Sequence, residues 1–176
     1  LGNIGVGAYG IIANLSLVVI AIFTGIAQGI QPLLSSFYGQ GNGINVKKIL
    51  HYAISLMSIL SIILYVIIFV YNKQIVSLFN SEYNNQLQVV AEVGLRLYFL
   101  ALPFAGYNII MSIYFTSIEN PLPSQLISLL RGLFLIVPVA ICLADILEIN
   151  GVWLSYPLTE MLVTLLTIII YFKISK

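Results

Sequence analysis

Charged side chains are scarce in this sequence of 176 residues. Asp, Glu, Lys and Arg make up 7% of it, whereas hydrophobic residues make up 60%. An ordinary soluble domain carries about 25% charged residues, and water does not tolerate so apolar a surface on a chain of this size. The net charge is only +1, and no basic stretch is interleaved with aromatic residues. The composition therefore indicates a membrane protein and excludes a nucleic-acid partner.

Cysteine and histidine are equally scarce. The only cysteine, Cys142, lies in an apolar run, and the only histidine, His51, has no second imidazole or carboxylate three or four positions away. A disulfide framework and a Cys/His zinc site are therefore excluded, and we expect no metal centre and no cofactor. An integral-membrane enzyme would need paired acids, a histidine cluster or a Ser/Lys dyad. We predict no catalytic residues, because Glu160 has no such companion.

Long apolar runs dominate what is present. The first, from Gly5 to Asn42, carries no charge and exceeds the roughly 20 residues that cross the hydrocarbon of a bilayer. The runs predict an all-α integral membrane protein, a bundle of five transmembrane helices. The expected helices cover residues 6–38, 49–71, 93–117, 124–143 and 152–172. One long polar interval, residues 72–92, and several shorter turns connect them.

The first expected helix contains amide side chains where lipid solvates them poorly. Gln28 and Gln31 lie just before Pro32, and a proline inside a helix removes a backbone donor and bends the axis. The two glutamines either hydrogen-bond a neighbouring helix or line a polar cavity. Both interpretations follow from the sequence.

A proline and polar side chains coincide a second time in the third expected helix. Pro103 lies near its middle, and Tyr107 and Asn108 follow. Irregular backbone at membrane depth is tolerated only where it faces protein or water. We therefore predict helix bends at Pro32, at Pro103 and, in the fourth helix, at Pro138.

Glu160 is the acid that needs an explanation. It lies eight residues into the last helix, about 12 Å from its end and close to the middle of the bilayer, where a carboxylate is costly. Arg131 is the obvious partner, but counting along straight helices places it about 10 Å deep and Glu160 about 18 Å deep. Direct contact then needs a bend or a long arginine reach. Glu160 is either a proton or ion carrier, a protonated acid bound to a carbonyl, or an acid wetted by a cavity.

Basic residues indicate the orientation in the membrane. With five crossings, the first turn, the turn at Glu119 and the C-terminus share one side, which is richer in Lys and Arg. The positive-inside rule makes that side cytoplasmic. We therefore expect a multi-pass protein of the cell membrane with a cytoplasmic C-terminus. Because the chain begins at Leu1 without Met, we also expect a piece of a longer polypeptide.

Several segments resemble one transporter family. They are AYGII, GIAQGIQPLLSSFYGQGN, LRLYFLALPFAGYNIIMSIYFTSIENP, SLLRGLFLIVPV and GVWLSYPLTE. Together they cover nearly the whole chain and resemble the C-terminal half of a bacterial multidrug and toxic compound extrusion (MATE) transporter. Such proteins have two six-helix lobes that exchange drugs for Na+ or H+. The resemblance implies that residues 1–176 are part of the C-terminal lobe.

The resemblance also implies roles and partners. It gives cavity positions to Gln28, Gln31, Tyr107 and Asn108, and it matches Glu160 to a commonly acidic position. The implied partners are the lipid bilayer, small-molecule drugs or organic cations, and an N-terminal lobe of the same polypeptide. Some family members carry an acid in the helix that corresponds to residues 93–117, and this chain has none there. The coupling acid is then Glu160 or a residue of the other lobe.

The resemblance implies secondary active efflux of drugs or organic cations. One other type of transporter is an alternative. A flippase-like transporter of lipid-linked or polysaccharide substrates would need a strongly basic cavity. Only Arg96 and Arg131 could furnish one here.

Overall fold

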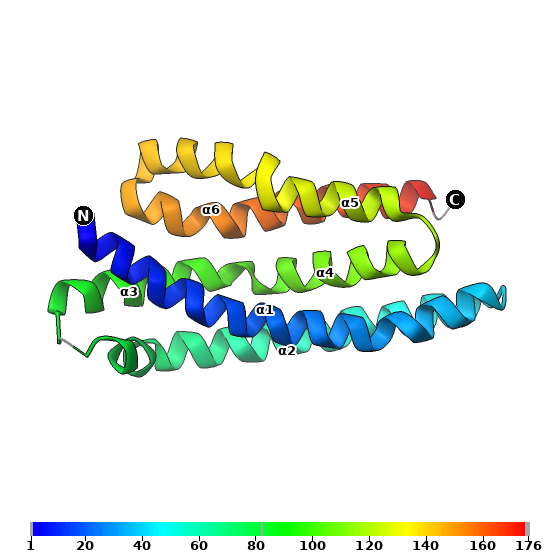
Figure 1. Ribbon diagram of the computed structural model, residues 1–176, viewed down its shortest axis with the longest axis horizontal. Coiled ribbons are helices and arrows are strands. Elements are labelled where there is room, and N and C mark those ends of the chain that lie inside the picture. The colour runs from blue at the N-terminus through cyan, green and yellow to red at the C-terminus, as the bar shows by residue number, and fades with distance from the viewer. Residues whose placement is uncertain (1, 82, 175–176) are drawn as a thin grey trace.

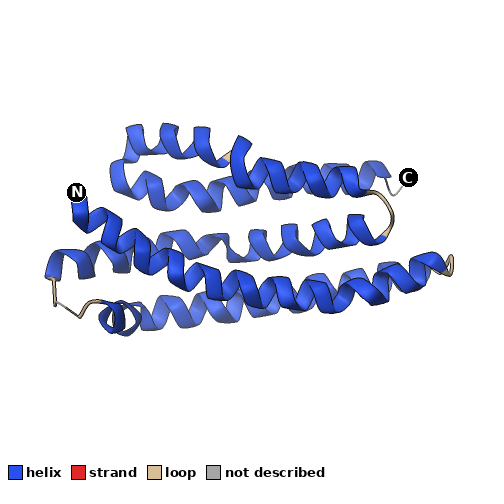
Figure 2. Ribbon diagram, in the orientation of Figure 1, coloured by secondary structure: helices blue, strands red, loops and turns tan. Residues whose placement is uncertain are grey.

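The computed structural model describes residues 2–81 and 83–174, and these residues form helices without a strand. The long helices are α1 (Gly2–Gly39), α2 (Gly43–Phe79), α3 (Asn85–Tyr98), α4 (Leu102–Ser117), α5 (Pro121–Leu129) and α6 (Ile136–Ile174). A 3₁₀ turn, η1 (Phe99–Ala101), joins α3 to α4, and a π-helical turn, η2 (Leu130–Phe134), joins α5 to α6. The expected all-α class is confirmed (Figure 2).

Four helical stretches of the described chain, rather than the expected five, are long and apolar enough to cross a membrane. The fourth, Pro121–Ile174, has 54 residues, about 80 Å of helix against a hydrocarbon core of about 30 Å. It reverses at Glu148, whose φ of 52° and ψ of −130° are not helical, and Figure 1 shows its two arms side by side. The expected helices 124–143 and 152–172 are these arms. Residues 145–150, expected as one of the shorter turns, are helical on both sides of Glu148.

The reversal depends on a glycine. A Cβ atom at Gly151 would overlap the backbone carbonyl of Leu143 in the other arm. Only glycine allows so close an approach of two backbone segments. The arms are therefore packed tightly where they turn.

The first two expected helices are longer in the structure. α1 continues through Pro32 without interruption. α2 begins after a tight turn in which Gly41 has a φ of +70°, and the Asn42 side chain accepts a hydrogen bond from the backbone N–H of Asn45. α2 leaves helical geometry at Tyr71 and then continues to Phe79, and its last turns are seen end-on in Figure 1.

Helix α4 is the centre of the bundle. It packs against α1, α2, α5 and α6, with α1 and α2 on one side and the α5–α6 pair on the other (Figure 1). A Cβ atom on Gly106 would lie 2.6 Å from Cγ of Met57, so α2 and α4 approach closely there. The core side chains with the largest volumes include Phe23, Leu34, Met57, Phe115 and Trp153.

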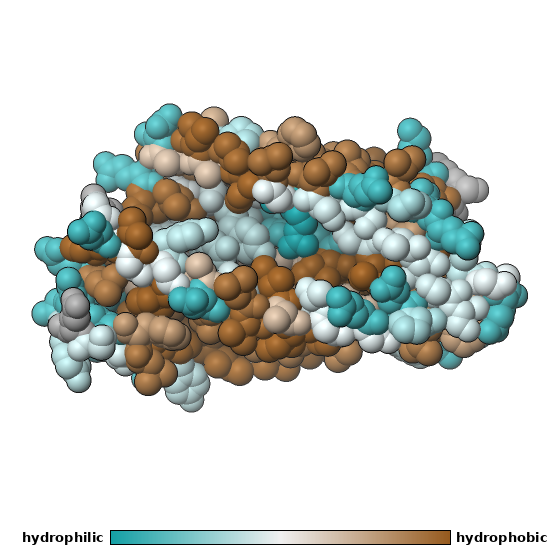
Figure 3. Space-filling view, in the orientation of Figure 1, coloured by the Kyte–Doolittle hydropathy of each residue, from teal (hydrophilic) through white to brown (hydrophobic). Residues whose placement is uncertain are grey.

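The ends and the outer surface fit a membrane. The α1–α2 turn, the α4–α5 turn and the C-terminus lie at one end, as the orientation argument requires, and the N-terminus and the α2–α3 connection lie at the other (Figure 1). Apolar side chains cover much of the visible side, and hydrophilic ones gather at both ends (Figure 3). Helix α2 exposes a row of large apolar residues: Leu56, Ile59, Ile63, Val66, Ile67 and Val70.

Candidate functional site: a buried acid, arginine and amide

Glu160 on α6 is completely buried, and both of its carboxylate oxygens are bound. Oε1 accepts hydrogen bonds from Nε of Arg131 at 2.9 Å and from Nη2 of Arg131 at 2.5 Å. Oε2 accepts a hydrogen bond from Nδ2 of Asn108 at 2.8 Å. An arginine that donates two hydrogen bonds to one carboxylate is among the strongest polar contacts in proteins. The interior of the bundle therefore contains a fixed ion pair.

This direct contact corrects the expectation from depth counting. In a straight helix Arg131 and Glu160 would be about 43 Å apart, and the reversal at Glu148 brings the two arms together. Arg131 lies in η2, where the helix departs from α geometry. Leu135 N–H bonds the carbonyl of Leu130 at 2.9 Å, a π-type bond that widens the turn holding Arg131.

Pro138 accounts for the position of the π turn. It lies four residues after Phe134, the last residue of η2, and proline has no N–H to offer the carbonyl four positions earlier. A regular α-helix therefore cannot run through this carbonyl. Pro103 also lies next to an irregular turn. It is the second residue of α4, which begins at Leu102 directly after the 3₁₀ turn η1.

Asn108 on α4 holds the acid through more than one contact. Its Nδ2 also donates to the backbone carbonyl of Glu160 at 3.1 Å. Its Oδ1 accepts from Oγ1 of Thr164 at 3.3 Å and from Oγ1 of Thr167 at 3.4 Å. The two threonines fix which way the amide points, and Asn108 itself is completely buried. Asn108 binds the acid rather than lining open space within this chain.

Thr164 and Thr167 are also part of the cluster, and neither was predicted from the sequence. They follow Glu160 by four and seven positions, a spacing that places all three on one face of a helix. Hydroxyl groups in apolar helices usually bond to their own backbone, and Thr164 also does so, donating to the Glu160 carbonyl at 2.8 Å. Their spacing from Glu160 is the sequence pattern from which the two threonines could have been predicted.

The other predicted cavity residues lie elsewhere. Gln28 is exposed and Gln31 is half-buried on α1, and neither side chain makes a hydrogen bond within residues 2–81 and 83–174. Gln28 lies between Gly25 and Gly29, where added Cβ atoms would meet nothing within 4 Å. This side of α1 is therefore open.

Tyr107 lines a separate cavity of about 250 Å³ between α2, α4 and α6. It is half-buried and adjoins Asn108 in the chain. Lys47, His51 and Tyr171 share this cavity with it. The structure therefore brings Asn108 and Glu160 together but places Tyr107 and the two glutamines in other surroundings.

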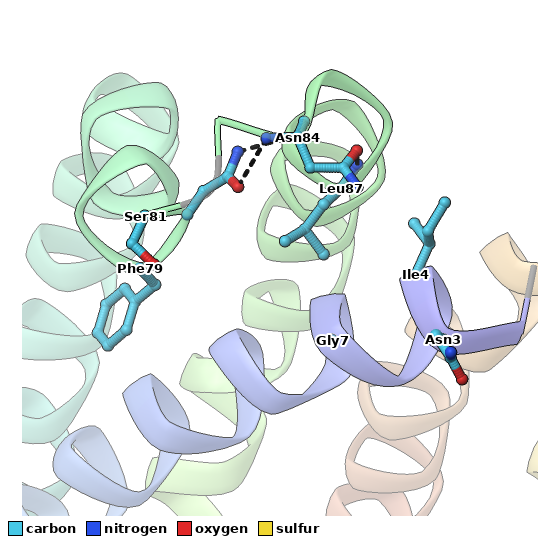
Figure 4. Close-up of a pocket in the computed structure, with 8 residues that line it drawn as sticks. Asn3, Ile4, Gly7, Phe79, Ser81, Asn84 and Leu87 are labelled. Atoms are coloured by element: carbon cyan, nitrogen blue, oxygen red, sulfur yellow. Dashed lines mark hydrogen bonds between the residues drawn. The ribbon is translucent and has the colours of Figure 1, made fainter.

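A larger cavity, about 350 Å³, lies at the end that carries the N-terminus (Figure 4). It is lined by Asn3, Ile4, Gly7, Phe79, Asn80, Ser81, Asn84 and Leu87. Asn80 and Asn84 bond one another, with Asn80 Nδ2 donating to the Asn84 carbonyl and Asn84 N–H donating to Asn80 Oδ1, both at 3.0 Å. None of the residues selected from the sequence lines it.

Metal ligands do not cluster in the described part of the chain. Within residues 2–81 and 83–174, no three His, Cys, Asp or Glu side chains lie close enough to hold a metal ion. The only ion pair formed by these residues is that of Arg131 and Glu160.

Comparison with known proteins gives the family. The family model described as MatE matches residues 1–142, so the chain belongs to the MatE family. The fold agrees with solved structures. An outward-facing multidrug resistance MATE family transporter superimposes with a TM-score of 0.88 at 19% identity, covering 94% of this chain and 37% of that one. A MOP superfamily transporter from Pyrococcus furiosus gives a TM-score of 0.87 at 20% identity, again over 94% and 37%.

One curated relative is similar in sequence. The FAD transporter of Shewanella oneidensis is 25% identical over 161 residues, which are 89% of this chain and 34% of that protein. The chain therefore spans about a third of the length of the relatives it matches.

Proposed function

We propose that this chain is part of a transporter that exports drugs or organic cations across the cytoplasmic membrane by antiport with Na+ or H+. The observation that carries the proposal is the buried cluster of Arg131, Glu160 and Asn108. Ionisable side chains inside a membrane bundle are costly and as a rule mark a path for ions or substrate. A purely structural bundle would be served as well by apolar side chains of similar volume.

Glu160 is the proposed coupling residue of this lobe. Its Oε1 is occupied by the Arg131 guanidinium, so a coupling ion must take the place of that cation. A proton on Glu160 would remove the negative charge that Arg131 binds, and Na+ would compete for the same oxygen. Either ion would release the helical arm that carries Arg131 from the helical arm that carries Glu160. Such a two-state contact is what alternation between two conformations requires.

Arg131 is more exposed to solvent than Glu160. The Arg131 side chain keeps 18% of its surface exposed, whereas the Glu160 side chain keeps 1%. An ion would therefore approach from the Arg131 side. The visible surface has a recessed, more hydrophilic strip between the α5–α6 layer and α1, bordered by apolar side chains (Figure 3).

The proposed substrate path uses the open side of α1. Gln28 and Gln31 offer amide groups on or beside this side, and the glycines on either side of Gln28 leave room for a ligand. Tyr107 lines a separate cavity and lies outside this proposed path. The N-terminal lobe of the same polypeptide would face this surface, and the C-terminus would lie in the cytoplasm.

The export function is tested in cells that express the full-length protein containing this chain. Accumulation of a fluorescent organic cation is measured with and without an ionophore that dissipates the ion gradients. We expect lower accumulation in expressing cells and loss of the difference with ionophore. Equal accumulation in expressing and control cells would end the efflux proposal.

A second candidate substrate is a flavin nucleotide. It is favoured by the relative named an FAD transporter, which is similar over 89% of this chain. Membrane vesicles that contain the full-length protein can be loaded with FAD or with an organic cation, and the release of the two compounds can be compared. Ion-dependent release of FAD alone would favour the second candidate.

A further inference from the structure

We propose that the cavity between α2, α4 and α6, at the end of the bundle that carries the C-terminus, binds a phosphate-bearing anion. This site is separate from the Glu160 cluster and does not depend on the proposed export function. Its lining includes four polar side chains, those of Lys47, His51, Tyr107 and Tyr171. None of the residues selected for ion coupling lines it.

The polar lining consists of hydrogen-bond donors. The Lys47 ammonium has three N–H groups, the His51 imidazole has at least one, and each tyrosine has a hydroxyl. Among the residues that the structure describes, no Asp or Glu side chain lines the cavity. A cation would therefore find no negative partner there, whereas a phosphate group would find a positive charge and several donors.

Helix α2 contributes Lys47 and His51 to the cavity. Lys47 is the fifth residue of the helix, which begins at Gly43, and His51 lies four positions further on, so the two share one face. Lys48 lies next to Lys47, and its ammonium is 5.9 Å from the ring centre of Tyr52. Lys48 does not line the cavity. Of the described residues that line the cavity, Lys47 and His51 are therefore the two able to place positive charge in it.

The apolar lining residues and the volume of the cavity limit the kind of ligand that it can hold. Leu50, Ile54 and Met111 complete the lining, so the cavity has an apolar side next to its donors. Its volume of about 250 Å³ is below the roughly 300–1,000 Å³ of pockets for drug-sized ligands. It suits a phosphate group attached to a short apolar or glycerol unit. A lipid headgroup and a water-soluble phosphate compound share this chemistry.

The cavity also adjoins the ion cluster through one helix. Tyr107 lines the cavity, and the next residue, Asn108, binds Glu160. A ligand on Tyr107 would therefore contact the same turn of α4 that positions the buried acid.

The test uses the purified, delipidated full-length protein with two probes. The first probe is phosphatidylglycerol, and its retention is counted by native mass spectrometry. The second is inorganic phosphate, and its binding is measured by calorimetry. The test variant is Lys47→Gln with His51→Gln, and the matched control is Lys48→Gln, one position away on the same helix. Lys47→Arg keeps the charge, and size-exclusion profiles show that each variant is folded.

We expect the double variant to weaken binding of at least one probe by about tenfold or more, because charge-assisted hydrogen bonds are lost. Lys48→Gln and Lys47→Arg are expected to stay within about twofold of the parent protein. Loss of phosphatidylglycerol alone identifies a lipid headgroup as the ligand, and loss of phosphate identifies a soluble one. Equal binding by parent and double variant, or an equal loss in Lys48→Gln, would overturn the proposal.

Discussion

Asn108 and Glu160 are joined by two hydrogen bonds from a single amide nitrogen, one to the carboxylate at 2.8 Å and one to the backbone carbonyl at 3.1 Å. The two residues are 52 positions apart in the chain. Their contact fixes the central helix α4 to the second arm of the α5–α6 hairpin. The buried acid is therefore held by its backbone as well as by its side chain.

Replacing Asn108 by Ala should lower the stability of the full-length protein. The change leaves Oε2 of Glu160 without its donor inside the bundle, and an unsatisfied buried polar group costs about 1–3 kcal/mol. We expect a lower Tm in detergent. Thr116→Ala is the control, because its hydroxyl is exposed and bonds only its own helix, to the Ser112 carbonyl. Equal Tm values for parent and N108A would show that the amide does not stabilise the acid.

A double-mutant cycle tests the ion pair. Arg131→Gln and Glu160→Gln each leave one buried charge without its partner, a loss of about 3–5 kcal/mol. The double variant removes both charges, and we expect it to be more stable than either single variant. The measurement is the Tm of all four proteins in the same detergent. A double variant whose losses simply add would mean that the two side chains do not interact.

The reversal at Glu148 should not tolerate a larger residue at Gly151. An added methyl group would overlap the Leu143 carbonyl, and neither backbone segment can yield as a flexible side chain would. We expect Gly151→Ala to reduce folded yield strongly. Gly43→Ala is the control, since it adds the same methyl group where nothing lies within 4 Å. Normal yield of G151A would place the hairpin arms further apart than described.

Gln28 should affect transport without affecting stability. It is exposed and makes no hydrogen bond within the described residues, so Gln28→Leu should change the free energy of unfolding by no more than about 0.5 kcal/mol. The Tm should therefore stay close to that of the parent. If Gln28 contacts substrate, export of an organic cation should fall severalfold. Gln125→Leu, at an exposed position of α5, is the matched control. An unchanged export rate for Q28L would remove Gln28 from the substrate path.

The positions of the helices could be predicted from the sequence because each helix contains a long, continuous run of apolar residues. Runs of about 20 apolar residues fix a span wherever they occur, and the predicted spans fall within the observed helices. The count differs because residues 145–150 are polar enough to suggest a loop, yet they stay helical except at Glu148. A single residue with positive φ performs the reversal.

The site was less predictable because its geometry depends on local departures from the α-helix. Glu160 stood out as an acid in an apolar run. Arg131 also stood out as its candidate partner, but a count at 1.5 Å per residue along straight helices placed the two side chains at different depths. That count does not contain the π turn at residues 130–134. Gln28 and Asn108 looked alike in the sequence, but one is exposed and the other buried, because each step along a helix turns about 100°.

Glu160 is the residue at which the coupling ion is proposed to act. The most direct measurement is ion-driven drug export in proteoliposomes that contain the full-length protein, its Glu160→Gln variant and a control variant, Asp145→Asn, changed at an exposed acid of α6. We predict that D145N responds to an imposed H+ or Na+ gradient as the parent does. E160Q should bind drug but show no response to the gradient. Gradient-driven export by E160Q at the parent rate would contradict the account.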